Sequence, residues 1–107
     1  MAKAMIKVSY SVEGLKGVKK AGGTSRVSAV EKALAGVGGT LESFYFAFGA
    51  DDVYVVAEVP DQAAAMAMAA TVGSSGAVTH YETIFLMTPA EVDAALGTTI
   101  DYAPPGS

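Results

Sequence analysis

Few side chains in this sequence could carry acid–base or ligand chemistry, and most of them fall in predicted strands. His80 is the only histidine among 107 residues, and there is no cysteine. A lone imidazole could act as a general base or bind a haem iron, whereas thiolate catalysis and cysteine zinc sites are excluded within this chain. On a strand, Glu82 would share a face with His80, and Tyr81 would point to the opposite face. A histidine at a strand surface or subunit contact is the alternative role.

Tyrosines form the second candidate group, because four of them lie in or beside predicted strands. Tyr45 and Tyr54 would face each other across a hairpin, and Tyr10 ends the first strand. Together with His80, Tyr45 and Tyr54 make up the candidate catalytic set. Such rings could instead line a pocket for a small apolar or aromatic ligand, or pack at an interface with their hydroxyl groups satisfied.

Basic residues surround the predicted start of a helix after Gly22-Gly23, where free N–H groups and the helix dipole could bind an anion. They are Lys16, Lys19, Lys20 and Arg26. We take Arg26, together with Tyr10, as the candidate ligand-binding residues, with a solvated basic helix face as the alternative. No phosphate-loop or dinucleotide-binding pattern accompanies the two glycines.

Two consecutive aspartates, Asp51 and Asp52, stand in a predicted turn. Metal binding would need converging oxygen ligands at suitable spacing, and the sequence has no calcium-loop pattern. Aspartates are common in turns because their side chains bind nearby backbone groups. We therefore assign this pair to turn stabilisation and expect neither a metal nor a cofactor.

Charge is divided unevenly along the chain. All 7 Lys and Arg lie at or before Lys32, whereas all but two of the 11 acidic residues lie beyond it, and the net charge is −4. Single-stranded nucleic acid is bound by basic residues interleaved with aromatic ones, but here the aromatic part of the chain is acidic. We expect no nucleic-acid partner and favour charge complementarity between subunits.

No stretch has the pattern of a signal peptide or the length of a membrane-spanning helix. The longest uncharged run, between Asp61 and Glu82, is interrupted by Gly73-Ser74-Ser75-Gly76 and by His80. We expect a cytoplasmic protein without a membrane partner.

Apolar periodicity and turn residues predict the elements that must position these side chains. We expect strands at 4–10, 40–48, 53–59 and 77–87, and helices at 12–20, 24–37, 62–72 and 89–96. Ser11, Asp61 and Thr88 would cap three of the helices, and Thr24 or Ser25 would cap the fourth. Residues 1–97 would form one domain, followed by an irregular tail at 98–107.

This order of elements predicts an α+β ferredoxin-like fold, a four-stranded antiparallel sheet with helices on one face. About the four-residue turn 49–52, the helix-facing side of the hairpin would include Phe44, Phe46 and Phe48. The opposite side would include Leu41, Tyr45, Tyr54 and Val56. That second side is too apolar for water, and 51% of the chain is hydrophobic. We therefore predict a homo-oligomer whose sheets pack face to face.

Segments along nearly the whole chain resemble the GYD-domain family. They are VSYSVEGLKGVKKAGGTSR, AVEK, GGTLESFYFAFG, DVYVVAEVPD, SGAV, LMTPAEVD and a closing Y-x-P-P-G. The family belongs to the dimeric α+β barrel superfamily, so the resemblance implies ferredoxin-like units that pair through their sheets, as a homodimer or higher homo-oligomer. It implies no established activity. The family's Gly-Tyr-Asp element corresponds here to Gly49-Ala50-Asp51-Asp52, which has no tyrosine.

Two functions remain open from the sequence. The first is a homo-oligomeric domain that binds a small molecule or a partner, or is structural, without defined catalysis. The second is a cofactor-free enzyme of the monooxygenase or isomerase type, with His80 and the strand tyrosines around a pocket between sheet and helices. A pocket-lining His80 close to a carboxylate or tyrosine would favour the enzyme, and a His80 buried in a subunit contact would favour the binding protein.

Overall fold

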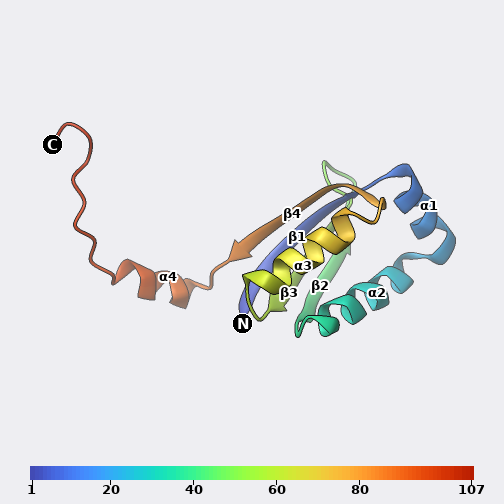
Figure 1. The fold of residues 1–107 in the computed structure, drawn as a ribbon, viewed down its shortest axis with the longest axis horizontal. Helices are drawn as coiled ribbons and strands as arrows, with labels where there is room; N and C mark the ends of the chain where they lie inside the picture. Colours follow the sequence, from blue (N-terminus) through green and yellow to red (C-terminus); the bar gives the residue numbers. More distant parts are fainter.

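The computed structural model describes residues 1–107 and confirms the ferredoxin-like arrangement (Figure 1). Strands β1 (Ala2–Tyr10), β2 (Thr40–Phe46), β3 (Val53–Val59) and β4 (Val78–Leu86) form one antiparallel sheet. Their order across the sheet is β2-β3-β1-β4. The helices are α1 (Val12–Ala21), α2 (Gly23–Gly36), α3 (Gln62–Gly73) and α4 (Pro89–Leu96).

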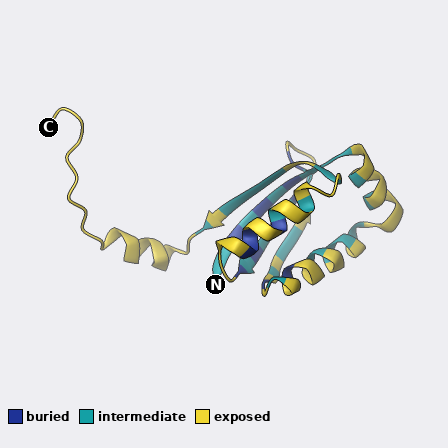
Figure 2. Ribbon diagram, in the orientation of Figure 1, coloured by how far each residue is buried: buried dark blue, intermediate teal, exposed yellow.

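The core lies between the two central strands and helices α2 and α3 (Figure 2). On β1 and β3, buried residues alternate with half-buried ones, because successive side chains on a strand point to opposite faces. Leu34 of α2 and Met68 of α3 pack against this buried side. The strand residues of the core are Ile6, Val8, Val53, Val55, Ala57 and Val59. The opposite side of the sheet has no helix over it, and we refer to it as the open face.

Local capping signals set three helix starts as expected. The Ser11 hydroxyl and the Asp61 carboxylate each accept a hydrogen bond from the backbone N–H three residues later, at 3.1 and 2.8 Å. Thr88 and Glu91 form a reciprocal capping box, with Pro89 at the first turn. These contacts confirm the predicted caps of α1, α3 and α4.

The start of α2 differs from the expectation. Neither Thr24 nor Ser25 caps it, and the helix begins at Gly23 after an N-cap at Gly22. Gly22 has a φ of 88°, which glycine adopts without the steric cost that a side chain would add. The chain can therefore end α1 and start α2 within one residue, so that the two helices follow each other around the end of the sheet.

The hairpin loop is longer than expected. Phe46 is the last residue of β2 and pairs with Val53, so residues 47–52 form the connection. The backbone N–H of Ala47 donates to the carbonyl of Asp52 at 2.9 Å and closes the loop. The backbone N–H of Asp52 donates to the carbonyl of Val8 at 2.8 Å and ties the loop to β1. Phe48 is therefore fully exposed, and the prediction that it faces the helices is wrong.

A register shift in β2 also changes which residues face the core. The shift lies between Leu41 and Ser43, and it brings Leu41 opposite Ala57 and into contact with the core. The prediction that Leu41 lies on the open face is therefore wrong, because the periodicity assumed no bulge. Tyr45 and Tyr54 are direct partners, as expected.

The segment after β4 extends away from the rest of the chain (Figure 1). No residue of α4 is buried. Large apolar side chains are exposed on α4 and on the tail that follows, namely Val92, Leu96, Ile100 and Tyr102. None of the helices is long and apolar enough to cross a membrane. The boundary between a domain at 1–97 and a tail at 98–107 stays a prediction.

Candidate functional site

A cavity of about 630 Å³ lies between the helix-facing side of the sheet and helices α1, α2 and α3. Its volume falls within the range of roughly 300–1,000 Å³ that is typical of small-molecule sites. Strand residues such as Ile6 and Val55 line it from the sheet, and Val18, Val30 and Met68 line it from the three helices. The lining is mostly hydrophobic, so it suits an apolar or aromatic body.

Close contact between α1 and the segment before β4 forms one rim of the cavity. The backbone N–H of Ser11 donates to the carbonyl of Ala77 at 2.9 Å, and the Ser11 hydroxyl donates to the carbonyl of Gly76 at 2.6 Å. A Cβ on Gly14 would collide with the carbonyl oxygen of Ala77. Glycine at position 14 therefore allows α1 to approach the β4 end of the sheet this closely.

Two polar atoms in the cavity lining are buried and have no hydrogen-bond partner. They are Nε of Arg26, near the start of α2, and the hydroxyl of Tyr81 on β4. Burial raises the pKa of Tyr81 to about 12, so its hydroxyl keeps its proton at neutral pH. Buried polar groups are usually paired, because an unpaired one loses its hydration without compensation.

Tyr10 adds a third polar group to the same lining. Burial raises the pKa of its hydroxyl, and the nearby guanidinium of Arg26 opposes part of this rise. The effect of Arg26 on the pKa of Tyr10 comes first from hydrogen bonding and then from its charge, so the two side chains are neighbours in the lining. The cavity combines an apolar wall with one guanidinium and two phenols.

Both sequence-predicted ligand-binding residues, Tyr10 and Arg26, thus line one cavity. Their role in binding stays a prediction, since the sequence argument placed an anion at the helix start and not inside the fold. Tyr81 was not among the predicted site residues. Alternation along the strand predicts only that Tyr81 and His80 point to opposite faces. The register of β4, which pairs Tyr81 with the buried Val8, shows that Tyr81 is the one that faces the helices.

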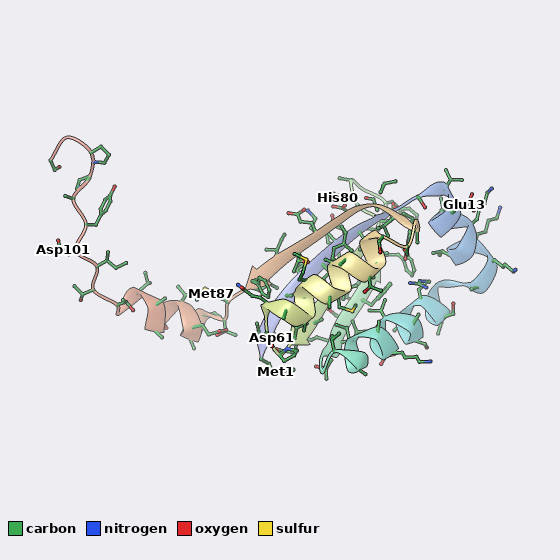
Figure 3. The ribbon with its side chains drawn as sticks, in the orientation of Figure 1. Met1, Glu13, Asp61, His80, Met87 and Asp101 are labelled. Atoms are coloured by element: carbon green, nitrogen blue, oxygen red, sulfur yellow. The ribbon has the colours of Figure 1, made fainter.

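The three candidate catalytic residues lie away from the cavity. Register places His80 opposite Ser9, and Tyr45 opposite Tyr54, all on the open face. None of the three lines the cavity, so their expected position around a pocket between sheet and helices is wrong. Figure 3 labels His80 on β4, toward the end of the strand far from Met87. Their catalytic role stays a prediction.

Asp51 joins β1 and β4 at this end of the open face. Its Oδ1 lies 2.9 Å from Nδ1 of His80 and accepts a hydrogen bond from the Ser9 hydroxyl at 3.0 Å. Its Oδ2 lies 3.4 Å from Nζ of Lys7. The hydrogen bond from His80, with smaller contributions from Ser9 and Lys7, holds the pKa of Asp51 below its ordinary value. Asp51 is the orienting partner for His80 that sequence reasoning did not find.

Lys7 extends this cluster along the open face. Its Nζ lies 3.5 Å from Glu82 and 5.9 Å from the centre of the Tyr54 ring. The charge of Glu82 is the largest cause that raises the pKa of Lys7. His80 stays half-exposed, with 52% of its side chain accessible. No group of three or more His, Cys, Asp and Glu side chains converges to hold a metal ion. The cluster can orient an imidazole, but one chain alone leaves it open to water.

The family model of the GYD domain matches residues 5–96, which is most of the chain. The chain belongs to the GYD domain family. The resemblance seen in the sequence is therefore confirmed, and the matched region contains every residue that lines the cavity and both members of the Asp51–His80 pair. Comparison with curated proteins gave no match. Since a fold does not determine a reaction, the function of this GYD domain must be argued from its sites.

Proposed function

We propose that this GYD domain is a homo-oligomeric binding protein that holds a small apolar or aromatic molecule between its sheet and helices. The cavity of about 630 Å³ is the observation that carries this proposal. Protein interiors are normally close-packed, with few spaces larger than a water molecule. This cavity opens in part to solvent and is mostly apolar, which is the arrangement of a concave small-molecule site.

The open face supports the homo-oligomeric part of the proposal. Met5 pairs with Val56 on one side and Ile84 on the other, so three apolar side chains cross the sheet in a row. Tyr45, which is 70% exposed, lies beside Tyr54 on the same face. Exposed apolar patches rimmed by polar residues are typical of interfaces, and we propose that a second copy covers this one. The cytoplasmic location of the protein and its lack of a nucleic-acid partner remain predictions.

A cofactor-free isomerase- or monooxygenase-type enzyme is the second candidate function, and the Asp51–His80 contact is the observation that favours it. The Asp51 carboxylate binds Nδ1 of the His80 ring and leaves Nε2 free, where it could act as a general base. His80, Tyr45 and Tyr54 would then act on a substrate enclosed between two paired sheets. This function requires the dimer, because the open face of one chain has no opposite wall.

Binding is tested with two probes of the same shape, the neutral 2-naphthalenemethanol and the acidic 2-naphthoate. Each is titrated into the isotopically labelled protein. At least one should shift the NMR signal of the Met68 methyl group, since Met68 lines the cavity. Val18→Trp should block the shift because its ring would occupy the cavity. Val12→Trp is the matched control, because Val12 is 70% exposed on the same helix and lies outside the lining. Failure of both probes to bind, or binding to Val18→Trp as to wild type, would contradict the proposal.

A further inference from the structure

Building on the proposed function, we infer that the molecule held in this cavity is an amphipathic carboxylic acid, with its carboxylate bound by Arg26 and Tyr81. The inference concerns the chemical class of the ligand. It rests on which polar groups the cavity contains, on their unpaired state and on the balance of charge around them.

Arg26 provides the positive charge. Its Nε is buried, lines the cavity and has no hydrogen-bond partner, and the guanidinium takes part in none of the ion pairs of the chain. Arg26 as a whole is half-buried, and a guanidinium with one buried, unpaired nitrogen and no counter-ion is unfavourable, because charge that loses hydration needs a partner. The neighbouring Tyr10 is a neutral phenol and does not balance this charge, so the missing counter-ion of Arg26 is an anion.

Tyr81 shows which atoms that anion must offer. The Tyr81 hydroxyl is buried without a partner, and it is protonated at neutral pH. A guanidinium only donates hydrogen bonds, and a protonated phenol can donate one as well. A carboxylate only accepts them, through two oxygen atoms, and so satisfies Arg26 and Tyr81 together.

The charge balance favours one carboxylate over a doubly charged phosphate. Arg26 is the only cationic side chain in the lining. The other charged lining residue, Glu13, is exposed at the rim and lies 3.9 Å from Nζ of Lys16. A dianion would keep an uncompensated negative charge in a largely apolar space, whereas a monoanion is neutralised by Arg26.

The apolar lining indicates the chemistry of the rest of the ligand, beyond its carboxylate. Phe44, Val30 and Met68 face the same space as Arg26, from β2, α2 and α3. They offer no hydrogen-bonding groups to a polar chain or a sugar. The body is therefore a hydrocarbon chain or an aromatic ring, and the polarity is confined to the carboxylate.

The test compares acids with neutral molecules of the same shape by isothermal titration calorimetry. The pairs are 2-naphthoate with 2-naphthalenemethanol and decanoate with 1-decanol. In at least one pair the acid should bind the wild-type protein about tenfold or more tightly than the alcohol, since a hydrogen bond to a charged group contributes about 1.5–3 kcal/mol. Binding of 2-naphthyl phosphate should be weaker than that of 2-naphthoate.

Arg26→Met should remove most of the preference for the acid and leave alcohol binding within about threefold of wild type, because it retains the apolar stem but not the charge. Lys32→Met is the matched control, since Lys32 is exposed on the same helix and lies outside the lining. Tyr81→Phe deletes a single oxygen and serves as the second variant if Arg26→Met does not fold. It should also weaken acid binding more than alcohol binding.

The outcomes separate this inference from the proposed function. Three results would overturn the inference that the ligand is a carboxylate: equal binding of acids and alcohols, tighter binding of the phosphate, or an acid preference that survives Arg26→Met. Each would leave the proposed binding function standing. Absence of binding by every probe would instead remove the proposed function, and the inference with it.

Discussion

The carboxylate of Asp51 lies 2.9 Å from Nδ1 of His80, although 29 positions separate the two residues in the sequence. The contact exists because the loop at residues 47–52 is tied to the end of β1 by the bond from the Asp52 N–H to the Val8 carbonyl, and the next residue of β1, Ser9, pairs with His80. Asp52 fixes that loop by accepting a hydrogen bond from the backbone N–H of Tyr10 at 2.8 Å. The open face therefore carries an oriented imidazole, while the cavity lies on the other side of the sheet.

The first prediction concerns the stability of the Asp51 contacts as pH falls. The pKa of Asp51 is lower in the folded protein than in the unfolded chain. The contribution of Asp51 to stability is therefore complete above the ordinary aspartate pKa, and it is lost as pH falls through the lower pKa of the folded protein. The free energy of unfolding should drop less between pH 6 and pH 3 in Asp51→Asn than in wild type. Urea denaturation at the two pH values measures this, with Asp101→Asn in the exposed tail as control. An identical drop in all three proteins would contradict the prediction.

The second prediction concerns the rim of the cavity. Gly14→Ala should destabilise the protein by about 1–3 kcal/mol, because the added methyl group collides with the backbone of Ala77 and forces α1 away from the sheet. Gly17→Ala is the matched control on the same helix, since a Cβ there meets no atom within 4 Å. It should raise stability by about 0.5–1 kcal/mol through helix propensity. Urea midpoints that are equal for the two variants would disprove the close approach.

The third prediction concerns Tyr81 in the ligand-free protein. Its hydroxyl is buried without a partner, so Tyr81→Phe should raise the free energy of unfolding by about 1 kcal/mol in the absence of any ligand. Tyr102→Phe, at an exposed position of the tail, should change it by less than about 0.5 kcal/mol. Calorimetric unfolding of the two variants measures the difference. A loss of stability in Tyr81→Phe would mean that the hydroxyl already has a partner in the free protein.

The fourth prediction concerns self-association. Sedimentation equilibrium at micromolar concentration should give a multiple of the chain mass of 10.8 kDa. Val56→Lys should shift this equilibrium toward the monomer, because it places a charge in the apolar row of the open face. Ala33→Lys, at an exposed position of α2, should leave it unchanged. Higher salt should weaken an association that depends on charge complementarity between subunits.

A monomeric mass for the wild-type protein at micromolar concentration would contradict the open-face interface. It would also remove the second candidate function, because Asp51 and His80 would then have no enclosed substrate. The binding cavity would be unaffected, since it lies within one chain.

Much of the fold could be predicted from the sequence because its signals are local. Alternating apolar residues identified β1 and β3, and side chains such as Ser11 and Asp61 identified helix starts. The hairpin register and the position of Leu41 could not be predicted. The loop is tied by Asp52 to the distant strand β1, and the position of Leu41 depends on a bulge within β2 that residue alternation does not reveal.

The candidate site shows the same division. Alternation correctly separates Tyr81 from His80, and Tyr10 and Arg26 were chosen because of their residue types. Neither observation reveals that Tyr10, Arg26 and Tyr81 line one cavity, since its walls come from all four strands, from three helices and from a connecting segment. Asp51 was assigned to its turn because consecutive aspartates are common there. Its contact with His80 depends on how the loop lies over the sheet.

A crystal structure of the protein with 2-naphthoate tests the central claim most directly. We expect the naphthyl ring between the sheet and α1 to α3, with its carboxylate within hydrogen-bond distance of Nε of Arg26 and of the Tyr81 hydroxyl. A cavity filled by the protein's own side chains, or 2-naphthoate bound only outside it, would contradict the account.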